Sequence, residues 1–127
     1  AAFVGEASLF DGRIVHSGPD GCVLRTAAGT LLRGTSRGAA GPEGAPARLI
    51  VRPENVRING AAQGGPAGEN RFQAQVEHLA YAGATTRVVL RLNDTERLAA
   101  NSVRPDFRIG DTVEASWQAA QSSIFVE

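Results

Sequence analysis

The residues that most often carry chemistry are few in this sequence and stand far apart. His16 and His78 are its two histidines, and neither has a second metal ligand at the spacing of a zinc site. Cys22 is the single cysteine, so it cannot form an internal disulfide, and the usual role of such a residue in a strand is that of a small buried side chain. We therefore expect no catalytic, cofactor-binding or metal-binding residue in this chain.

The sequence also gives little support for phosphate-binding or nucleophilic chemistry. The sequence contains no lysine, so it has no Gly-Lys-Ser/Thr phosphate loop of the nucleotide hydrolases. Residues 34–38 (GTSRG) have the Gly-x-Ser-x-Gly spacing, but no serine has a paired base nearby in sequence, so serine nucleophile chemistry is unsupported. Glu54 lies near Arg52 and Arg57, an arrangement that predicts an ion-paired corner rather than a catalytic acid. We infer that the chain itself is not an enzyme and needs no cofactor.

The overall charge excludes a second group of functions. Thirteen basic residues balance thirteen acidic residues, so the formal net charge is zero at pH 7. Nucleic acid is held by a positive field and an anionic membrane by a basic block, and the chain has neither. No apolar run approaches the roughly 18 residues of a membrane span. We therefore expect no nucleic-acid partner and no direct membrane insertion, and the single cysteine fits a reducing compartment such as the cytoplasm.

Short β-strands are the elements that position the side chains. Within 70–92, apolar and polar residues alternate, and a period of two is typical of half-buried strands. A break at 81–84, which contains Gly83, predicts a bulge or a sharp bend, and only 97–101 could form a helical turn or two. The alternation in 70–92 and 112–118 places Phe72, Val76, Val88, Leu90, Val113 and Trp117 inside, and Gln73, Gln75, Arg87 and Arg91 outside.

Two stretches with almost no large apolar residues divide the chain. Residues 38–47 (GAAGPEGAPA) and 60–69 (GAAQGGPAGE) predict surface loops. We expect an N-terminal strand set at 1–37, a loop at 38–47 and a larger β-barrel portion at 48–127. The fold is predicted to be all-β, as one small barrel or a pair of barrels built from short antiparallel strands. Because methionine is absent, we expect the sequence to be a piece of a longer protein.

Several short strings, in order along the chain, resemble one protein family. The opening FVGEASLFDGRI at 3–14 is similar to the segment that follows the nucleotide-binding domain in ATPase subunits of ABC importers of the spermidine/putrescine and ferric-iron type, with Ser8 in place of the usual Asn. LIVRPENV at 49–56 resembles an Arg-Pro-Glu segment of the same subunits. Residues 81–88 and 110–117 resemble the tail of their TOBE domain, a transport-associated OB-fold.

The resemblance implies an OB-like barrel of the TOBE type at the C-terminus of an ATP-binding subunit. Its role there would be regulation and dimerisation during ATP-driven import of polyamines or iron. The implied partners are a second copy of the subunit and, through the parent protein, the permease subunits. The implied location is the cytoplasm, peripheral to the inner membrane. ATP and Mg²⁺ would bind the parent outside this chain, because the family's ATP-binding residues have no counterparts here.

Two other functions are weighed against this one. A molybdate-type TOBE pair would hold a small oxyanion, but such proteins typically open with Ser-Ala-Arg-Asn and end in a Lys-rich segment, and both features are absent here. An OB-fold for single-stranded nucleic acid would need a positive groove and exposed aromatic side chains. Most of the seven aromatic residues fall instead on the inferred inward faces of strands. The oxyanion module is therefore the alternative function.

Overall fold

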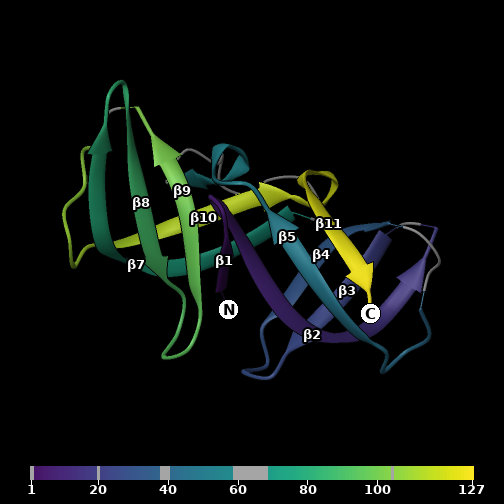
Figure 1. Ribbon diagram of the computed structural model, residues 1–127. Coiled ribbons are helices and arrows are strands. Elements are labelled where there is room, and N and C mark those ends of the chain that lie inside the picture. Colours follow the sequence, from purple (N-terminus) through teal and green to yellow (C-terminus); the bar gives the residue numbers. More distant parts are fainter. Residues whose placement is uncertain (1, 20, 38–40, 59–68, 104) are drawn as a thin grey trace.

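The structure, a computed structural model, describes residues 2–19, 21–37, 41–58, 69–103 and 105–127 (Figure 1). The first half of the chain forms β1 (Ala2–Val4), β2 (Ala7–Gly18), β3 (Gly21–Thr26), β4 (Leu31–Arg37), β5 (Pro46–Val51), the short 3-10 helix η1 (Pro53–Asn55) and β6 (Arg57–Ile58). The second half forms β7 (Glu69–Ala82), β8 (Thr85–Arg91), β9 (Arg97–Ser102), β10 (Thr112–Gln118), the 3-10 helix η2 (Ala119–Gln121) and β11 (Ser122–Val126). The all-β prediction is confirmed, and the helical turn expected at 97–101 is wrong, because β9 pairs there with β8.

The strands form two barrels that lie side by side (Figure 1). In barrel A the order is β2-β3-β4-β11-β5, and β5 pairs again with β2, which closes the sheet on itself. The order in barrel B is β6-β10-β7-β8-β9, with β6 in contact with β9. Neighbouring strands are antiparallel except β4 and β11, which run parallel. β1 lengthens the sheet of barrel A by pairing with the start of β2.

The two halves of the chain repeat one pattern of strand pairing. Leu24 faces Leu32 across β3 and β4, and Leu90 faces Leu98 across β8 and β9, so equivalent residues are 90 − 24 = 66 positions apart. The same separation relates η1 to η2, since 119 − 53 = 66. On β2 and β7 the separation is 76 − 14 = 62, because Ile14 faces Leu24 as Val76 faces Leu90. The β7–β8 hairpin is longer than the β2–β3 hairpin, which accounts for the difference.

The last strand of each half belongs to the other barrel. β6 follows β5 of barrel A along the chain but pairs with β10 of barrel B, while β11 follows β10 and pairs with β4 and β5 of barrel A. Neither half therefore completes a barrel alone. The division expected at 38–47 falls inside barrel A, since β4 precedes it and β5, which already begins at Pro46, belongs to the same barrel. Of the two expected loops, 38–40 and 60–68 lie outside the described residues, and Glu69 already belongs to β7.

The predicted inward and outward faces agree with the structure at most positions. Five of the six residues predicted to be inside are buried: Val76, Val88, Leu90, Val113 and Trp117. Phe72 is partly buried against Trp117, with ring centroids 5.8 Å apart. Gln73 and Gln75 are exposed, while Arg87 and Arg91 are half-buried. Four of the seven aromatic residues, Phe10, Phe72, Phe107 and Trp117, are buried or partly buried, as predicted for most of them, while Phe3, Tyr81 and Phe125 are exposed.

The segment 81–84 forms the turn of a hairpin. Ala82 pairs with Thr85, and Gly83 takes a φ of 66°, a left-handed conformation that favours glycine. The predicted sharp bend is therefore a turn between β7 and β8. The bulge in β7 lies earlier, between Val76 and His78.

Gly12 is a position in β2 with no room for a side chain beside β3. A Cβ added at this position would collide with the backbone carbonyl oxygen of Arg25 and would lie 2.7 Å from Leu24 Cδ2. Because a backbone carbonyl in a strand cannot turn away, we expect Gly12→Ala to lower the free energy of unfolding by about 1–3 kcal/mol. Denaturant unfolding measures the change. Thr35→Ala, at an exposed position of β4, serves as the control, and an unchanged midpoint for Gly12→Ala would contradict the close approach.

Candidate functional site

The residues whose side chains could react or bind a metal do not gather in one place. His16 on β2 and His78 on β7 occupy equivalent positions, and both are exposed. Cys22 is buried in β3, and this burial raises the pKa of its thiol. Within the described ranges, no three His, Cys, Asp or Glu side chains lie close enough to hold a metal ion. The expectation that the chain has no catalytic, cofactor or metal site stays a prediction.

The predicted ion-paired corner is present at η1. Arg52 Nε donates to Glu54 Oε2 at 2.9 Å. The pKa of Glu54 is lowered, first by a hydrogen bond from its own backbone N–H and then by the bond from Arg52. Arg57 pairs with Glu69 instead of Glu54. Both partners at the corner are exposed, so the pair is an ordinary surface contact.

Polar side chains near the start of β2 and β7 join the two barrels. The backbone N–H of Ala99 on β9 donates to Ser8 Oγ at 2.9 Å. In the other direction, Arg33 N on β4 donates to Asn70 Oδ1 at 2.7 Å, and Asn70 Nδ2 donates to Arg33 O at 2.9 Å. These contacts are equivalents, because 99 − 33 = 66 and 70 − 8 = 62. Ser8 and Asn70 are buried, so each satisfies backbone groups of the opposite barrel.

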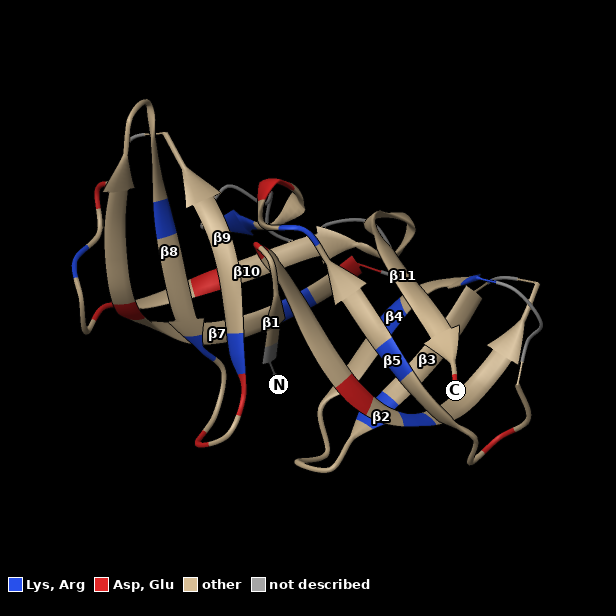
Figure 2. Ribbon diagram, viewed as in Figure 1, with Lys and Arg blue, Asp and Glu red and all other residues tan. Residues whose placement is uncertain are grey.

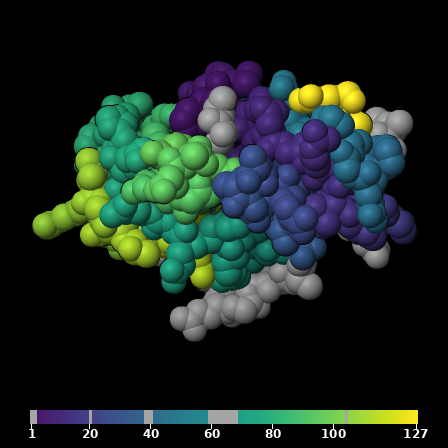
Figure 3. Space-filling model, turned by 90° about the horizontal axis from the view of Figure 1, so that it is seen from below, coloured from purple at the N-terminus to yellow at the C-terminus, as the bar shows by residue number. Residues whose placement is uncertain are grey.

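Two further contacts join residues that are equivalents of each other. Thr30 Oγ1 donates to Glu96 Oε1 at 2.5 Å, and Gln121 Nε2 donates to Asn55 Oδ1 at 3.5 Å. Within each pair the separation is 66, since 96 − 30 and 121 − 55 give the same number. Contacts between equivalents arise where an axis of approximate two-fold symmetry passes. The view from below shows the turn that follows β8 packed against the β3–β4 turn at this point (Figure 3).

Glu96 is a carboxylate buried at this axis, with 4% of its surface exposed. Desolvation by burial is the largest influence on its pKa and raises it. Hydrogen bonds from Thr30, Asn93 and Thr26 together outweigh that influence, so the pKa of Glu96 lies below its ordinary value. The contact from Asn93 Nδ2 is 2.8 Å long. At neutral pH the axis therefore holds an ionised carboxylate with donors from both barrels.

The charge of Glu96 should stabilise the fold at neutral pH. A folded-state pKa below the unfolded value gives stability that is present above about pH 4.3 and lost as the pH falls through the folded pKa. We expect Glu96→Gln to lower the free energy of unfolding at pH 7 by about 1–2 kcal/mol, and the difference from the unmodified chain to shrink by pH 3. Denaturant unfolding at both pH values measures this. Glu77→Gln, which removes a more exposed ion pair with Arg97, is the control, and an equal loss from Glu96→Gln at both pH values would contradict a role for the charge.

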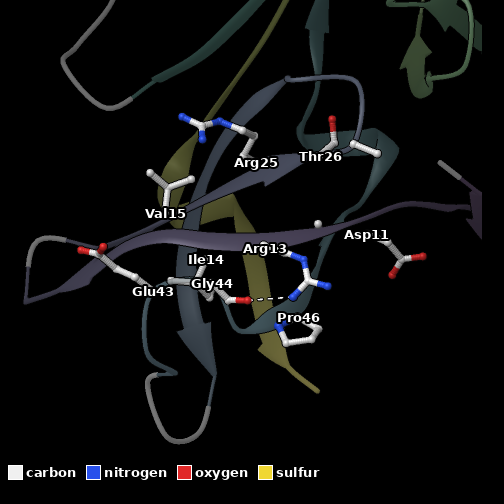
Figure 4. A pocket seen from close by; sticks show the side chains of 11 residues that line it. Asp11, Arg13, Ile14, Val15, Arg25, Thr26, Glu43, Gly44 and Pro46 are labelled. Atoms are coloured by element: carbon white, nitrogen blue, oxygen red, sulfur yellow. Dashed lines mark hydrogen bonds between the residues drawn. The ribbon is translucent and has the colours of Figure 1, made fainter.

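A groove with a volume of about 590 Å³ lies on the outer face of barrel A (Figure 4). Its lining includes Gly12, Arg13, Ile14, Val15, Arg25 and Pro46. Arg13 Nη1 donates to Gly44 O at 2.9 Å, at one wall of the groove. Barrel B carries a smaller groove, of about 230 Å³, at equivalent positions that include Gln75, Arg91 and Thr112. The fold therefore builds the same depression twice.

Comparison with known proteins identifies the family. Residues 49–125, more than half of the chain, match the family described as the TOBE domain. The chain belongs to the TOBE domain family. This membership confirms the predicted barrel type.

Curated relatives of this TOBE-domain chain share one name. It is 30% identical over 124 residues to the spermidine/putrescine import ATP-binding protein PotA of Rubrobacter xylanophilus, covering 94% of this chain and 31% of that protein. The PotA of Nitratidesulfovibrio vulgaris is 28% identical over 123 residues, with 92% of this chain and 33% of that protein covered. The TOBE-domain chain thus spans about a third of the length of these relatives.

A solved structure confirms the pair of barrels. The cytoplasmic molybdate-binding protein ModG, solved with molybdate bound, superposes with a TM-score of 0.77 and covers 94% of this chain and 95% of its own. The sequence identity is 13%, so the likeness shows the fold alone. Of the described residues, none belongs to a helix with the length and hydropathy that a membrane span requires.

The residues that join the barrels were missed by the sequence reasoning. Asn70, Thr30 and Glu96 lie in no motif, and Ser8 was singled out only as the replacement of an Asn in the family's opening segment. The internal repeat was the available signal. It aligns Phe10 with Phe72, His16 with His78, Leu24-Arg25 with Leu90-Arg91, and Leu32 with Leu98.

Proposed function

We propose that this TOBE-domain chain is a non-catalytic, C-terminal regulatory and dimerisation region of the ATP-binding subunit of an ABC importer of the spermidine/putrescine type. The observation that carries the proposal is the similarity to three PotA proteins over 92–94% of this chain but only 31–33% of theirs. In the parent, the remaining two-thirds would bind ATP and Mg²⁺ and meet the permease subunits at the cytoplasmic side of the inner membrane. The relatives favour polyamines over iron as the imported solute.

The junction between the barrels suits a rigid adaptor. Each barrel receives one strand from the other half of the chain, and buried hydrogen bonds of Ser8 and Asn70 tie the barrels together. A rigid body that contacts its copy outside the ATP sites would keep two motor domains together while they open, because it raises their effective concentration. An isologous contact is the simplest way for two such copies to meet.

Self-association of the isolated chain tests the dimerisation role. Without the motor domains, the contact could bury less than the roughly 1,200 Å² of a stable complex, so we expect a monomer–dimer equilibrium that shifts toward dimer between micromolar and millimolar concentration. Light scattering across a concentration series measures it. ATP turnover should not exceed that of a heat-killed sample. A strict monomer at millimolar concentration would contradict the self-association of the isolated region.

The oxyanion-binding module stays the second candidate. The fold of ModG is shared, but a likeness of fold does not transfer a ligand. Titration of the chain with molybdate, followed by calorimetry, separates the two functions, because stoichiometric molybdate binding would favour the second candidate.

A further inference from the structure

The two equivalent grooves differ in whether a carboxylate pairs with their arginine. In barrel B, Arg91 pairs through Nη2 with Asp94, and its Nε donates to Asn93 O at 3.3 Å. The residue of barrel A equivalent to Asp94 is Ala28, since 94 − 66 = 28. In the part of the chain that the structure describes, Arg25 has no carboxylate within ion-pair distance. The arginine that is neutralised in barrel B is thus unneutralised in barrel A, and its side chain is exposed.

A second arginine reinforces the positive charge of the barrel A groove. Arg13 faces Arg25 in the β2–β3 register, whereas the equivalent pair in barrel B is Gln75 and Arg91. Like charges directly opposite each other weaken a sheet. Arg13 donates to the uncharged carbonyl of Gly44, so it too lacks a carboxylate partner among the described residues. Basic positions are visible on β2, β3, β4 and β5 of this barrel (Figure 2).

The acidic residues at the groove do not neutralise Arg13 and Arg25. Asp11 pairs with Arg48, with 3.2 Å between Oδ1 and Nε. Glu43 lies on the side of the groove away from Arg13 (Figure 4). Between the charged groups, the lining is apolar and includes Val15 and Pro46. The groove therefore offers guanidinium groups beside an apolar surface.

We propose that the groove of barrel A binds a small organic anion. Its carboxylate or phosphate group would pair with Arg25 and Arg13, because guanidinium groups bind both kinds of oxyanion in a bidentate manner. Its apolar part would lie against Val15 and Pro46. The volume of about 590 Å³ falls in the range of about 300–1,000 Å³ typical of sites for small ligands. This site does not depend on the proposed function, because it belongs to one barrel of a single chain.

Titration of the whole 127-residue chain with simple probes tests the site. The probes are hexanoate and hexyl phosphate, with inorganic phosphate to test the head group alone and hexylamine as a cation of the same length. Backbone amide shifts in the NMR spectrum should move saturably at Gly12 and Thr26 with the two hexyl anions. Inorganic phosphate should bind more weakly because it has no apolar part. Binding of hexylamine as tight as that of hexanoate, or no saturable shift at millimolar concentration, would overturn the proposal.

Three variants locate the binding in barrel A. Arg25→Gln should weaken hexanoate binding on the order of tenfold, as expected for the loss of a charge-assisted pair. Ala28→Asp should weaken it similarly, because it places in barrel A the carboxylate that barrel B carries at Asp94. Arg91→Gln, the equivalent change in barrel B, is the matched control and should leave the affinity unchanged. All three positions are away from the core, and unchanged melting shows that the fold is intact. The proposal would be overturned if Arg25→Gln and Ala28→Asp both bound hexanoate as tightly as the unmodified chain does.

Discussion

Leu90→Asp should abolish cooperative unfolding of the chain. Leu90 has no exposed surface and lies in β8 between Val76 of β7 and Leu98 of β9. A carboxylate at this position would be buried without a partner. The free-energy cost of this burial is comparable to the whole stability of a typical domain, which is about 5–15 kcal/mol. Circular dichroism during heating and the dispersion of the NMR spectrum measure the loss.

The neighbouring residue gives the control for this substitution. Arg91 points outward and pairs with Asp94, whose side chain is 90% exposed, so Arg91→Ala should change the free energy of unfolding by less than about 1 kcal/mol. A shift of one residue in register would exchange the two faces of β8. A melt in which Arg91→Ala is more damaging than Leu90→Asp would therefore contradict the strand pairing described above.

Removal of residues 122–127 should also eliminate cooperative unfolding, although it deletes a short terminal segment. β11 fills the space between β4 and β5, and Ile124 lies fully buried opposite Leu49. Without β11, barrel A would have two unpaired strand edges and an open core. Barrel B receives β6 from the first half of the chain, whose other strands form barrel A, and the two barrels share buried hydrogen bonds. The damage should therefore spread to both barrels.

A single substitution in β11 separates this effect from a general sensitivity of the terminus. Phe125 is 41% exposed, so Phe125→Ala should retain a cooperative transition close to that of the unmodified chain. The melting curves of the truncated and substituted chains are the comparison. A truncated chain that still melts in one sharp transition at the original temperature would contradict the exchange of strands between the barrels.

The strands themselves were predictable because their residues alternate locally. Residues 112–118 were predicted as a strand and form β10 with those bounds, since Val113, Ala115 and Trp117 turn to the core. The pairing partners were not predictable in this way. The assignment of β11 to barrel A depends on contacts with β4 and β5, which are about 70 to 90 residues away in the sequence, and local periodicity carries no information about them.

The junction between the barrels shows a second limit of the sequence pattern. Asn70 shares the inward face of β7 with Phe72 and Val76, and its side chain is 3% exposed, but the alternation does not show that it bonds Arg33 of the opposite barrel. Its role is visible only when the pair of barrels is known. The same holds for Glu96, whose acceptor role depends on Thr30 from the other half of the chain. The internal repeat would have predicted two barrels, but not which side chains meet between them.

Sedimentation velocity of the parent ATP-binding subunit, without nucleotide and with or without this TOBE-domain region, tests the proposed function most directly. We expect the intact subunit to sediment as a dimer, because under the proposed function these regions would hold two copies together while the motor domains are apart. The subunit lacking residues 1–127 should sediment as a monomer at the same concentration. Dimers of equal stability in both forms would contradict a dimerisation role for this region.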